Sequence, residues 1–366
     1  MSERTKNIVI TCLFSIVFLG FFGVNILKKD QDVSEQERRR LKQFPAMSME
    51  RILDTTFMED FNKYTVDQFV FRDEFRSLKA YTELDLFRKK DYNDLFVHDG
   101  HVFKILYPLN EAGIKISTNK MNAIYDTYLA GKENVYYGII PDKNYYLSDD
   151  LGYLKLDYDR FVSLVQSGVK DMHYIDLFDT LSLDSYFKTD IHWRQDKLFG
   201  TARRIGDAMQ IPVAGFDSYR ETKVPGFKGA YYGQIAKLIA TDTLVYLSNE
   251  ALDRTTVYRA DTGTFGGIYD LDKLSGIDKY DVFLSGAVPF LEINNLDATT
   301  DRELIIFRDS FGSSLAPLLV ESYQQVTLVD IRYISTDYLA ELVEFKDQDV
   351  LFLYSVNILN NGAVLR

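Results

Sequence analysis

A series of short, almost wholly apolar runs constrains the fold of this 366-residue chain more than any other feature. A strand with one solvated face alternates apolar and polar residues, so a run that is apolar throughout is typical of a strand buried on both faces. Segments with helical periodicity separate the runs, which predicts a three-layer α/β domain with a mostly parallel sheet at residues 94–366. The runs are "NVYYGIIPDK" (134–143), "MHYIDLF" (172–178), "ELIIFRDS" (303–310), "QVTLVDIR" (325–332) and "DVLFLYSV" (349–356).

Inside this domain, residues 212–300 have a different composition. Segments such as "VPGFKGAYYGQIA" and "TTVYRADTGTFGGIYDL" are rich in glycine, aromatic and β-branched residues. Such segments are typical of hairpins and long loops. We therefore expect a β-rich insertion at about residues 212–300.

The first 30 residues predict a membrane anchor. No charged residue occurs from Asn7 to Leu27, and a helix needs about 20 apolar residues to cross the hydrocarbon core of a bilayer. A cleaved signal peptide is the main alternative, but its apolar region is about 7 to 15 residues long and ends in a small-x-small site. The sequence "GVNILKKD" has no such site, so we expect an uncleaved single-pass span within residues 1–30.

Residues 31–93 are expected to form a juxtamembrane and helical region. The stretch "QDVSEQERRRLKQFPAMS" (31–48) is polar and charged, as in a connecting segment. Beyond it, apolar side chains recur at mostly helical spacings, which predicts short amphipathic helices whose aromatic stripe packs in a core. These side chains are Ile52, Phe57, Phe61, Tyr64, Phe69, Phe71, Phe75 and Leu78.

Composition restricts the partners and cofactors. A net charge of −12 argues against nucleic acid as a partner. The single cysteine, Cys12, lies in the apolar N-terminal segment, so the rest of the chain folds without a disulfide or a thiolate metal site. The histidines lack the close spacing of a zinc enzyme, and His98 and His101 are expected at a hairpin turn. The sequence predicts no metal and no cofactor.

The stretch "SYFKTDIHWRQD" (185–196) contains the first candidate for chemistry, Asp190 with His192. The two residues are expected on a loop that enters a helix, where side chains two positions apart point the same way. The carboxylate can then orient one imidazole nitrogen and leave the other free as a general base. The same pair also occurs in purely structural loops, and Trp193 is expected to pack in the core. The helix is predicted from about Gln195, with Leu198, Ala202, Ile205 and Met209 on its buried face.

A nucleophile is available where a predicted strand ends. In "ELIIFRDSFGSSLAPLL" the strand Leu304 to Phe307 leads into a turn at Ser310 and then an apparent helix. Ligands bind at the carboxyl ends of strands in open α/β sheets, and backbone N–H groups at such a turn can stabilise an oxyanion. Pro317 favours a helix start near Ser313 or Ser314. A serine at this kind of junction can also serve only as a helix cap.

Together these motifs resemble the DHHW family and, more widely, the SGNH-like domains of alginate O-acetylation proteins. "YFKTDIHWR" is similar to the signature loop Y-[YF]-K-T-D-x-H-W of the family. "RDSFGSSLAPLL" is similar to its D-S-[FY] motif, and "VDIRYIS" is similar to a D-x-R-Y segment. The similarity covers about residues 36–366, departs from the family at Ile191, and implies an SGNH-like, flavodoxin-like fold.

The resemblance implies a role for each matching position. Ser310 would be the nucleophile, His192 the base and Asp190 the residue that orients the imidazole, in the order Asp, His, Ser of the alginate-type relatives. Further candidates are implied for the substrate or the oxyanion, each with a structural alternative such as pairing of Arg332 with Asp330. They are Arg332, Arg308 and Asn357. Tyr145 and Lys143 are further candidates because their loop follows a strand at a sheet edge where ligands could bind.

The resemblance also implies the activity and its setting. It implies an O-acetyltransferase or acetylesterase that acts on a cell-surface or exported polysaccharide, with a membrane-bound O-acyltransferase as acetyl donor. Related proteins work outside the membrane, so the large domain is expected to be extracytoplasmic, although Lys28, Lys29 and the basic residues after them would favour the cytoplasm. The alternatives are a noncatalytic polysaccharide-binding or assembly protein and a hydrolase that faces the cytosol.

Overall fold

The computed structural model describes residues 1–366, and the chain divides into two compact units. One unit comprises Met1–Tyr92 with Tyr232–Leu238, and the other comprises Asn93–Tyr231 with Ile239–Arg366. The boundaries expected at residues 30 and 93 stay predictions.

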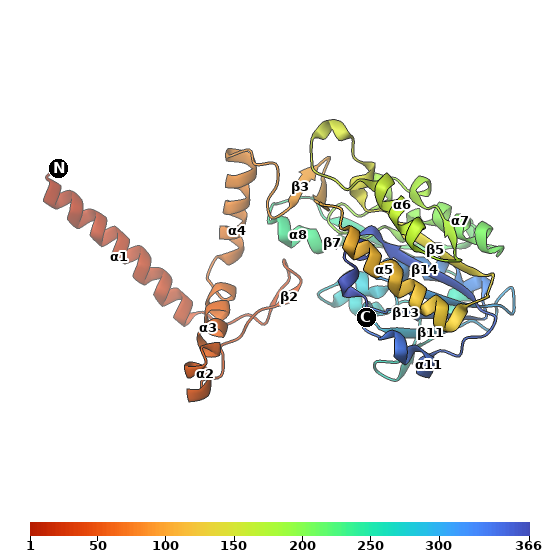
Figure 1. Cartoon of the computed structure of the whole chain (residues 1–366). Coiled ribbons are helices and arrows are strands. Elements are labelled where there is room, and N and C mark those ends of the chain that lie inside the picture. Colours follow the sequence, from red (N-terminus) through yellow and green to blue (C-terminus); the bar gives the residue numbers. More distant parts are fainter. The chain divides into compact units, whose positions relative to one another are not determined.

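An eight-stranded sheet forms the centre of the second unit, with the strand order β10-β9-β11-β13-β12-β14-β5-β6 (Figure 1). The five strands from β13 to β6 are parallel to one another, while β11, β9 and β10 add antiparallel pairs at one edge. The predicted mixed α/β fold with a mostly parallel sheet is confirmed. The strands are β5 (Val135–Ile140), β6 (His173–Ile175), β9 (Thr256–Arg259), β10 (Thr264–Gly266), β11 (Phe290–Asn294), β12 (Glu303–Arg308), β13 (Gln325–Val329) and β14 (Asp349–Ser355).

Helices cover both faces of this sheet. Leu304 and Ile306 of β12 share an apolar core with α7 (Phe199–Met209). The alternate residues, Ile305 and Phe307, pack with α5 and α6 on the other face (Figure 1). Since both faces are covered, the four central residues of the strand, from Leu304 to Phe307, are all apolar. The helices of the second face are α5 (Glu111–Ile124), α6 (Tyr158–Gly168), α11 (Leu339–Leu342) and α12 (Val356–Asn360).

The glycine-rich region 212–300 supplies strands to two sheets. Strands β7 (Arg220–Phe227) and β8 (Asp242–Ser248) form a separate antiparallel hairpin. Strands β9 to β11, by contrast, extend the main sheet. The region is β-rich as expected, but half of it belongs to the central layer. His98 and His101 pair across the hairpin of β3 (Leu95–His98) and β4 (His101–Lys104), as the sequence indicates.

Two helices differ from the sequence expectation in length. The helix after Ser310, α10 (Gly312–Leu315), begins earlier than expected and is a single turn. Pro317 lies in the 3₁₀ turn that follows, because proline cannot donate the backbone bond that a continuing helix needs. The second helix, α7, begins at Phe199 rather than near Gln195, because Gln195–Lys197 form a separate 3₁₀ turn. Its predicted buried face is confirmed by Ala202, Ile205 and Met209.

The first unit is helical with a small two-stranded pairing. Its longest element, α1 (Glu3–Leu27), has no buried residue and is long and apolar enough to cross a membrane, as a signal sequence also is. The predicted amphipathic helices are present, but the expected core position is wrong. None of the eight apolar side chains is buried, and five are exposed: Ile52, Phe69, Phe71, Phe75 and Leu78. The remaining elements are β1 (Val33–Ser34), β2 (Arg39–Arg40), α2 (Met49–Leu53), α3 (Thr56–Asp67) and α4 (Arg72–Tyr81).

Candidate active site

Ser310 lies on a tight turn just after β12, between the carboxyl ends of two neighbouring parallel strands. Asp309 fixes this turn, because its Oδ1 accepts the N–H of Phe311 (3.0 Å) and its Oδ2 accepts the N–H of Ser355 at the end of β14 (2.9 Å). The Ser310 side chain is half-buried, and its backbone N–H has no acceptor within the protein. The turn therefore presents a hydroxyl together with an unused N–H donor.

A second loop carries Asp190 and His192. Tyr186 and Trp193 form an antiparallel bridge at its base, and the N–H of Phe187 donates to the carbonyl of His192 (3.1 Å). This pairing folds residues 186–193 into a hairpin that ends in Asp190 and places His192 on its returning side.

The two loops bring the predicted residues into hydrogen-bond contact. His192 Nε2 lies 2.8 Å from Ser310 Oγ, and His192 Nδ1 lies 2.6 Å from Asp190 Oδ1. An ionised carboxylate only accepts hydrogen bonds, so Nδ1 carries the proton and Nε2 accepts the one on the serine hydroxyl. The Asp190 side chain is fully buried, while that of His192 is 12% exposed. This is the geometry of a serine activated by a base that a carboxylate orients.

Aromatic rings hold the imidazole of His192 in place. The ring of Tyr280 stacks on it with centroids 3.9 Å apart and planes 10° apart, and Phe311 contacts it at 4.9 Å. The hydroxyl of Tyr280 shares a hydrogen bond with Ser314 Oγ (2.9 Å), and burial raises the pKa of this tyrosine. Tyr280 therefore fixes the plane of the base and remains neutral at physiological pH.

Trp193 has more than the packing role expected from the sequence. It is fully buried, and its indole N–H donates to the carbonyl of Phe311 (3.0 Å) and to Ser314 Oγ (2.9 Å). The residue next to the base thus binds the turn that follows the nucleophile. One side chain connects the two loops of the site.

Lys143 supports the loop that carries Asp190. It begins the 3₁₀ turn after β5 and is only 3% exposed. Its ammonium donates to the carbonyls of Phe187 (3.0 Å), Lys188 (3.2 Å) and Asp190 (2.8 Å). Every N–H of the ammonium therefore has an acceptor on this loop.

The arginine candidates lie around one buried carboxylate. Arg332 forms a bidentate pair with Asp330, from Nε to Oδ1 (2.9 Å) and from Nη2 to Oδ2 (2.6 Å). This ion pair was the structural alternative to a role of Arg332 in binding substrate or the oxyanion. Arg308 is fully buried, donates to the carbonyl of Val288 (3.2 Å), and lies 3.9 Å from Asp330. Its Nε and Nη1 have no hydrogen-bond partner, and burial lowers its pKa.

The other two candidates form no hydrogen bond with Asp190, His192 or Ser310. Asn357 lies in the first turn of α12, half-buried, and its side chain makes no hydrogen bond. Tyr145 packs edge to face against Tyr146 and Phe178 and is 37% exposed. Neither side chain has a hydrogen bond or a ring contact with His192 or Ser310.

Several contributors to the site have no signal in the sequence. Tyr280 comes from the glycine-rich region and shares no motif with the histidine it covers. The N–H of Ala230 donates to Asp190 Oδ2 (2.6 Å), and Asp242 accepts the N–H of Thr189 (2.8 Å). Neither the sequence "AYYG" that begins at Ala230 nor the isolated Asp242 indicates these contacts. The partners lie far apart in the chain and are brought together only by tertiary packing.

The sheet order, the two covered faces and the serine turn define an SGNH-like α/β protein with a Ser-His-Asp arrangement at its strand ends. Residues 169–329 match the model of the DHHW protein family. The resemblance seen in the sequence is therefore confirmed over this part of the chain.

Solved structures show the same fold. A DHHW family protein from Eubacterium siraeum is 20% identical, with 75% of this chain and 94% of that chain covered and a TM-score of 0.61. Bacillus cereus PatB1 with a sulfonyl adduct is 18% identical, with 72% and 95% covered and a TM-score of 0.57. No curated protein sequence matches the chain.

Proposed function

We propose that the chain is a membrane-anchored, extracytoplasmic O-acetyltransferase or acetylesterase that acts on a cell-surface or exported polysaccharide. The observation that supports this most is the pair of short contacts from His192, 2.8 Å to Ser310 and 2.6 Å to Asp190. The DHHW resemblance implies the same roles for these three residues.

The proposed reaction is acyl transfer in two steps. His192 takes the proton of Ser310 as Oγ attacks the acetyl carbonyl, and the tetrahedral oxyanion receives the backbone N–H of Ser310. Protonated His192 then gives its proton to the leaving oxygen, which leaves an acetyl ester on Ser310. A sugar hydroxyl or water attacks this ester, again with His192 as base, and releases the serine.

The donor and the location belong to the same proposal. A membrane-bound O-acyltransferase would supply the acetyl group, and α1 would hold the domain at the outer surface. Its uncharged stretch from Asn7 to Leu27 supports a membrane span.

Hydrolysis of a chromogenic acetyl ester by the soluble part after α1 tests the activity. The wild type should hydrolyse the ester, while Ser310→Ala should reduce kcat by roughly 10³-fold or more. The matched control is Ser313→Ala, since Ser313 lies in the adjoining helix α10 and its hydroxyl has no hydrogen-bond partner. If the wild type hydrolyses the ester only at the background rate, and Ser310→Ala does not change that rate, the chain would instead be a noncatalytic polysaccharide-binding or assembly protein.

A further inference from the structure

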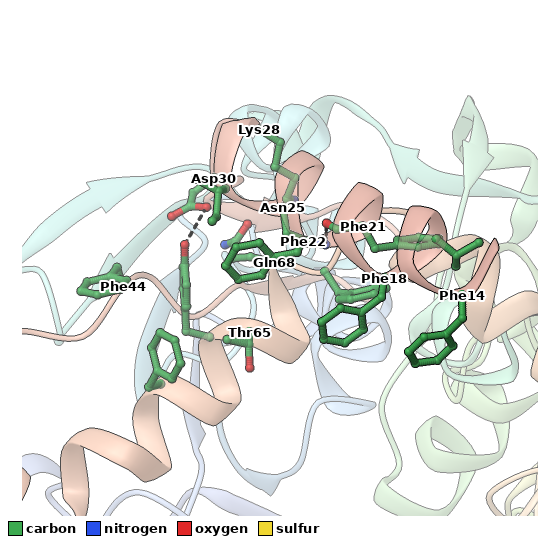
Figure 2. A pocket seen from close by; sticks show the side chains of 15 residues that line it. Phe14, Phe18, Phe21, Phe22, Asn25, Lys28, Asp30, Phe44, Thr65 and Gln68 are labelled. Carbon is green, nitrogen blue, oxygen red and sulfur yellow. Dashed lines mark hydrogen bonds between the residues drawn. The ribbon is translucent and has the colours of Figure 1, made fainter. Parts of the chain in front are cut away.

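A groove in the first unit lies between α1 and the segment that follows it. It has a volume of about 910 Å³, within the range of about 300 to 1,000 Å³ typical of small-molecule sites. Figure 2 shows rings from α1 along one wall and polar side chains grouped at the other end.

The apolar walls come from two helical stripes. On α1 the lining residues Phe14, Phe18 and Phe21 recur at spacings of four and three, so they share one face. On α3 and the turn after it, Phe61 and Phe69 line the opposite side. The rings of Phe21 and Phe69 stack at 5.8 Å, which joins the two walls.

The polar end lies where α1 stops. Asn25 accepts the N–H of Val70 (2.9 Å), and Tyr64 donates to Asp30 (3.2 Å). Lys28 lines the groove at this end and has no ion-pair partner. An unpaired ammonium at the mouth of an aromatic groove suits an anionic group attached to an apolar chain.

The length of the groove matches one leaflet of a bilayer. A helix rises 1.5 Å per residue, so about 21 Å separate Phe14 from Lys28. Half of a hydrocarbon core is about 15 Å thick. The remaining length between Phe14 and Lys28 would reach the level of the lipid headgroups. Tyrosine and basic side chains such as Tyr64 and Lys28 favour that level.

We propose that this groove binds a membrane phospholipid, with one acyl chain along Phe14, Phe18 and Phe21 and the headgroup phosphate at Lys28. The proposal rests on the membrane anchoring included in the proposed function. The bound lipid would fix the juxtamembrane helices against α1 and so set the height of the chain above the bilayer.

Native mass spectrometry of the full chain in detergent, with phosphatidylglycerol added, tests the groove. Thr65 lines it, so Thr65→Trp should fill it and weaken lipid binding at least tenfold, while Val66→Trp, at an exposed neighbour outside the groove, should bind as the wild type does. Lys28→Ser should weaken binding several-fold, and Lys29→Ser should not.

Equal lipid binding by the wild type, Thr65→Trp and Lys28→Ser would overturn the site. N-terminal sequencing and membrane fractionation of the same protein separate this failure from that of the anchor. A mature chain that begins after α1 would overturn both the anchor and the groove, and ester hydrolysis is scored independently of either.

A second and independent inference concerns Lys143. We propose that it is a positioning residue, whose ammonium holds the loop 187–190 so that Asp190 faces His192. The proposal rests on the three donated hydrogen bonds and on the burial of the side chain.

The surroundings of Lys143 make this support dependent on pH. Burial lowers the pKa of Lys143 to about 7, against the opposing effect of the carboxylates of Asp190, Asp242 and Asp142. The rings of Phe103 and Tyr231 lie 5.5 and 5.2 Å from Nζ, and His101 faces the same group. Loss of the proton removes one of three N–H donors, so one loop carbonyl loses its partner.

The pH profile of ester hydrolysis tests this role. Lys143→Met should reduce kcat by about 10- to 100-fold through misplacement of the catalytic groups, and should remove the fall in kcat/KM that the wild type shows as pH rises through about 7. Lys155→Met is the control, because Lys155 pairs with Asp149 away from this loop. If Lys143→Met has wild-type activity, or a reduced rate with the pH profile of the wild type, the positioning role of Lys143 would be overturned. Faster amide hydrogen exchange at residues 186–192 in Lys143→Met is a readout that needs no turnover.

Discussion

At the scale of single residues, the carboxylate of Asp190 determines what His192 can do. Its Oδ1 accepts both the N–H and Nδ1–H of His192, and its Oδ2 accepts the N–H of Ala230. Both oxygens of a fully buried carboxylate thus have donors. A carboxylate satisfied in this way can only accept, which fixes the imidazole tautomer.

We expect Asp190→Asn to reduce kcat for acetyl ester hydrolysis by roughly 10² to 10⁴-fold, because an amide can present N–H groups to Nδ1 and stabilise the wrong tautomer. Steady-state kinetics with folded protein checks this. Asp196→Asn, which loses only a contact with Arg194, should retain activity, and near wild-type kcat in Asp190→Asn would remove Asp190 from the mechanism.

His101 makes the stability of the domain depend on pH. Burial, with the charges of Lys143 and Lys188, lowers its pKa from 6.5 to about 4. Between these values the unfolded chain binds the proton and the folded chain does not, so the free energy of unfolding decreases as pH falls from about 6.5 to 4. Urea unfolding at several pH values should show this decrease. It should be smaller in His101→Phe but unchanged in His173→Phe, since His173 is exposed. Equal decreases in all three proteins would contradict this assignment.

At the scale of elements, the loop of Asp190 depends on the segment before α8 (Ala230–Ile235). The N–H of Gly229 donates to Thr189 Oγ1 (2.9 Å). A Cβ at Gly229 would lie 2.4 Å from the Cβ of Asp190 and 2.4 Å from the carbonyl oxygen of Thr189. Backbone from two distant parts of the chain therefore meets at the orienting carboxylate.

We expect Gly229→Ala to displace the loop and reduce kcat by about 100-fold, as a shift near 1 Å does at an active site. The control is Gly215→Ala, because a Cβ there meets no atom within 4 Å. Kinetics and circular dichroism of both variants check the effect. Full activity in Gly229→Ala would show that the loop does not need this contact.

The elements that the sequence predicts are those whose cause is local. Leu304 to Phe307 are apolar because both faces of β12 are covered, and this pattern is visible in the letters alone. Strand β11, by contrast, pairs with β13 and β9 in the main sheet, and its partners depend on tertiary packing. The same holds for the site, where Asp190 and His192 are neighbours in sequence but Tyr280 reaches them only in the folded chain.

At the scale of the whole molecule, the chain contains a helix long and apolar enough to cross a membrane and an SGNH-like domain. The net charge of the whole chain is −12. Each unit is compact by itself. The proposed anchor would keep the proposed acyl-transfer site close to the membrane surface, where the proposed acetyl donor would lie.

We expect the full chain to remain in the membrane fraction after alkaline carbonate extraction. Protease added to intact cells should digest residues 31–366, because the large domain is proposed to lie outside. A cytosolic control protein should stay intact in the same cells. Protection of the domain until the cells are lysed would reverse the topology and favour a hydrolase that faces the cytosol.

The proposed function depends on Ser310 as a nucleophile that His192 activates. Sulfonyl fluorides react with activated hydroxyls, and PatB1, which shares the fold, has been solved with a sulfonyl adduct. Peptide mass mapping after treatment with phenylmethanesulfonyl fluoride tests the claim most directly. We predict one adduct, on Ser310 and not on Ser313 or Ser314, that is absent in His192→Ala. An unmodified Ser310 in the folded wild type, or equal modification in His192→Ala, would contradict the account.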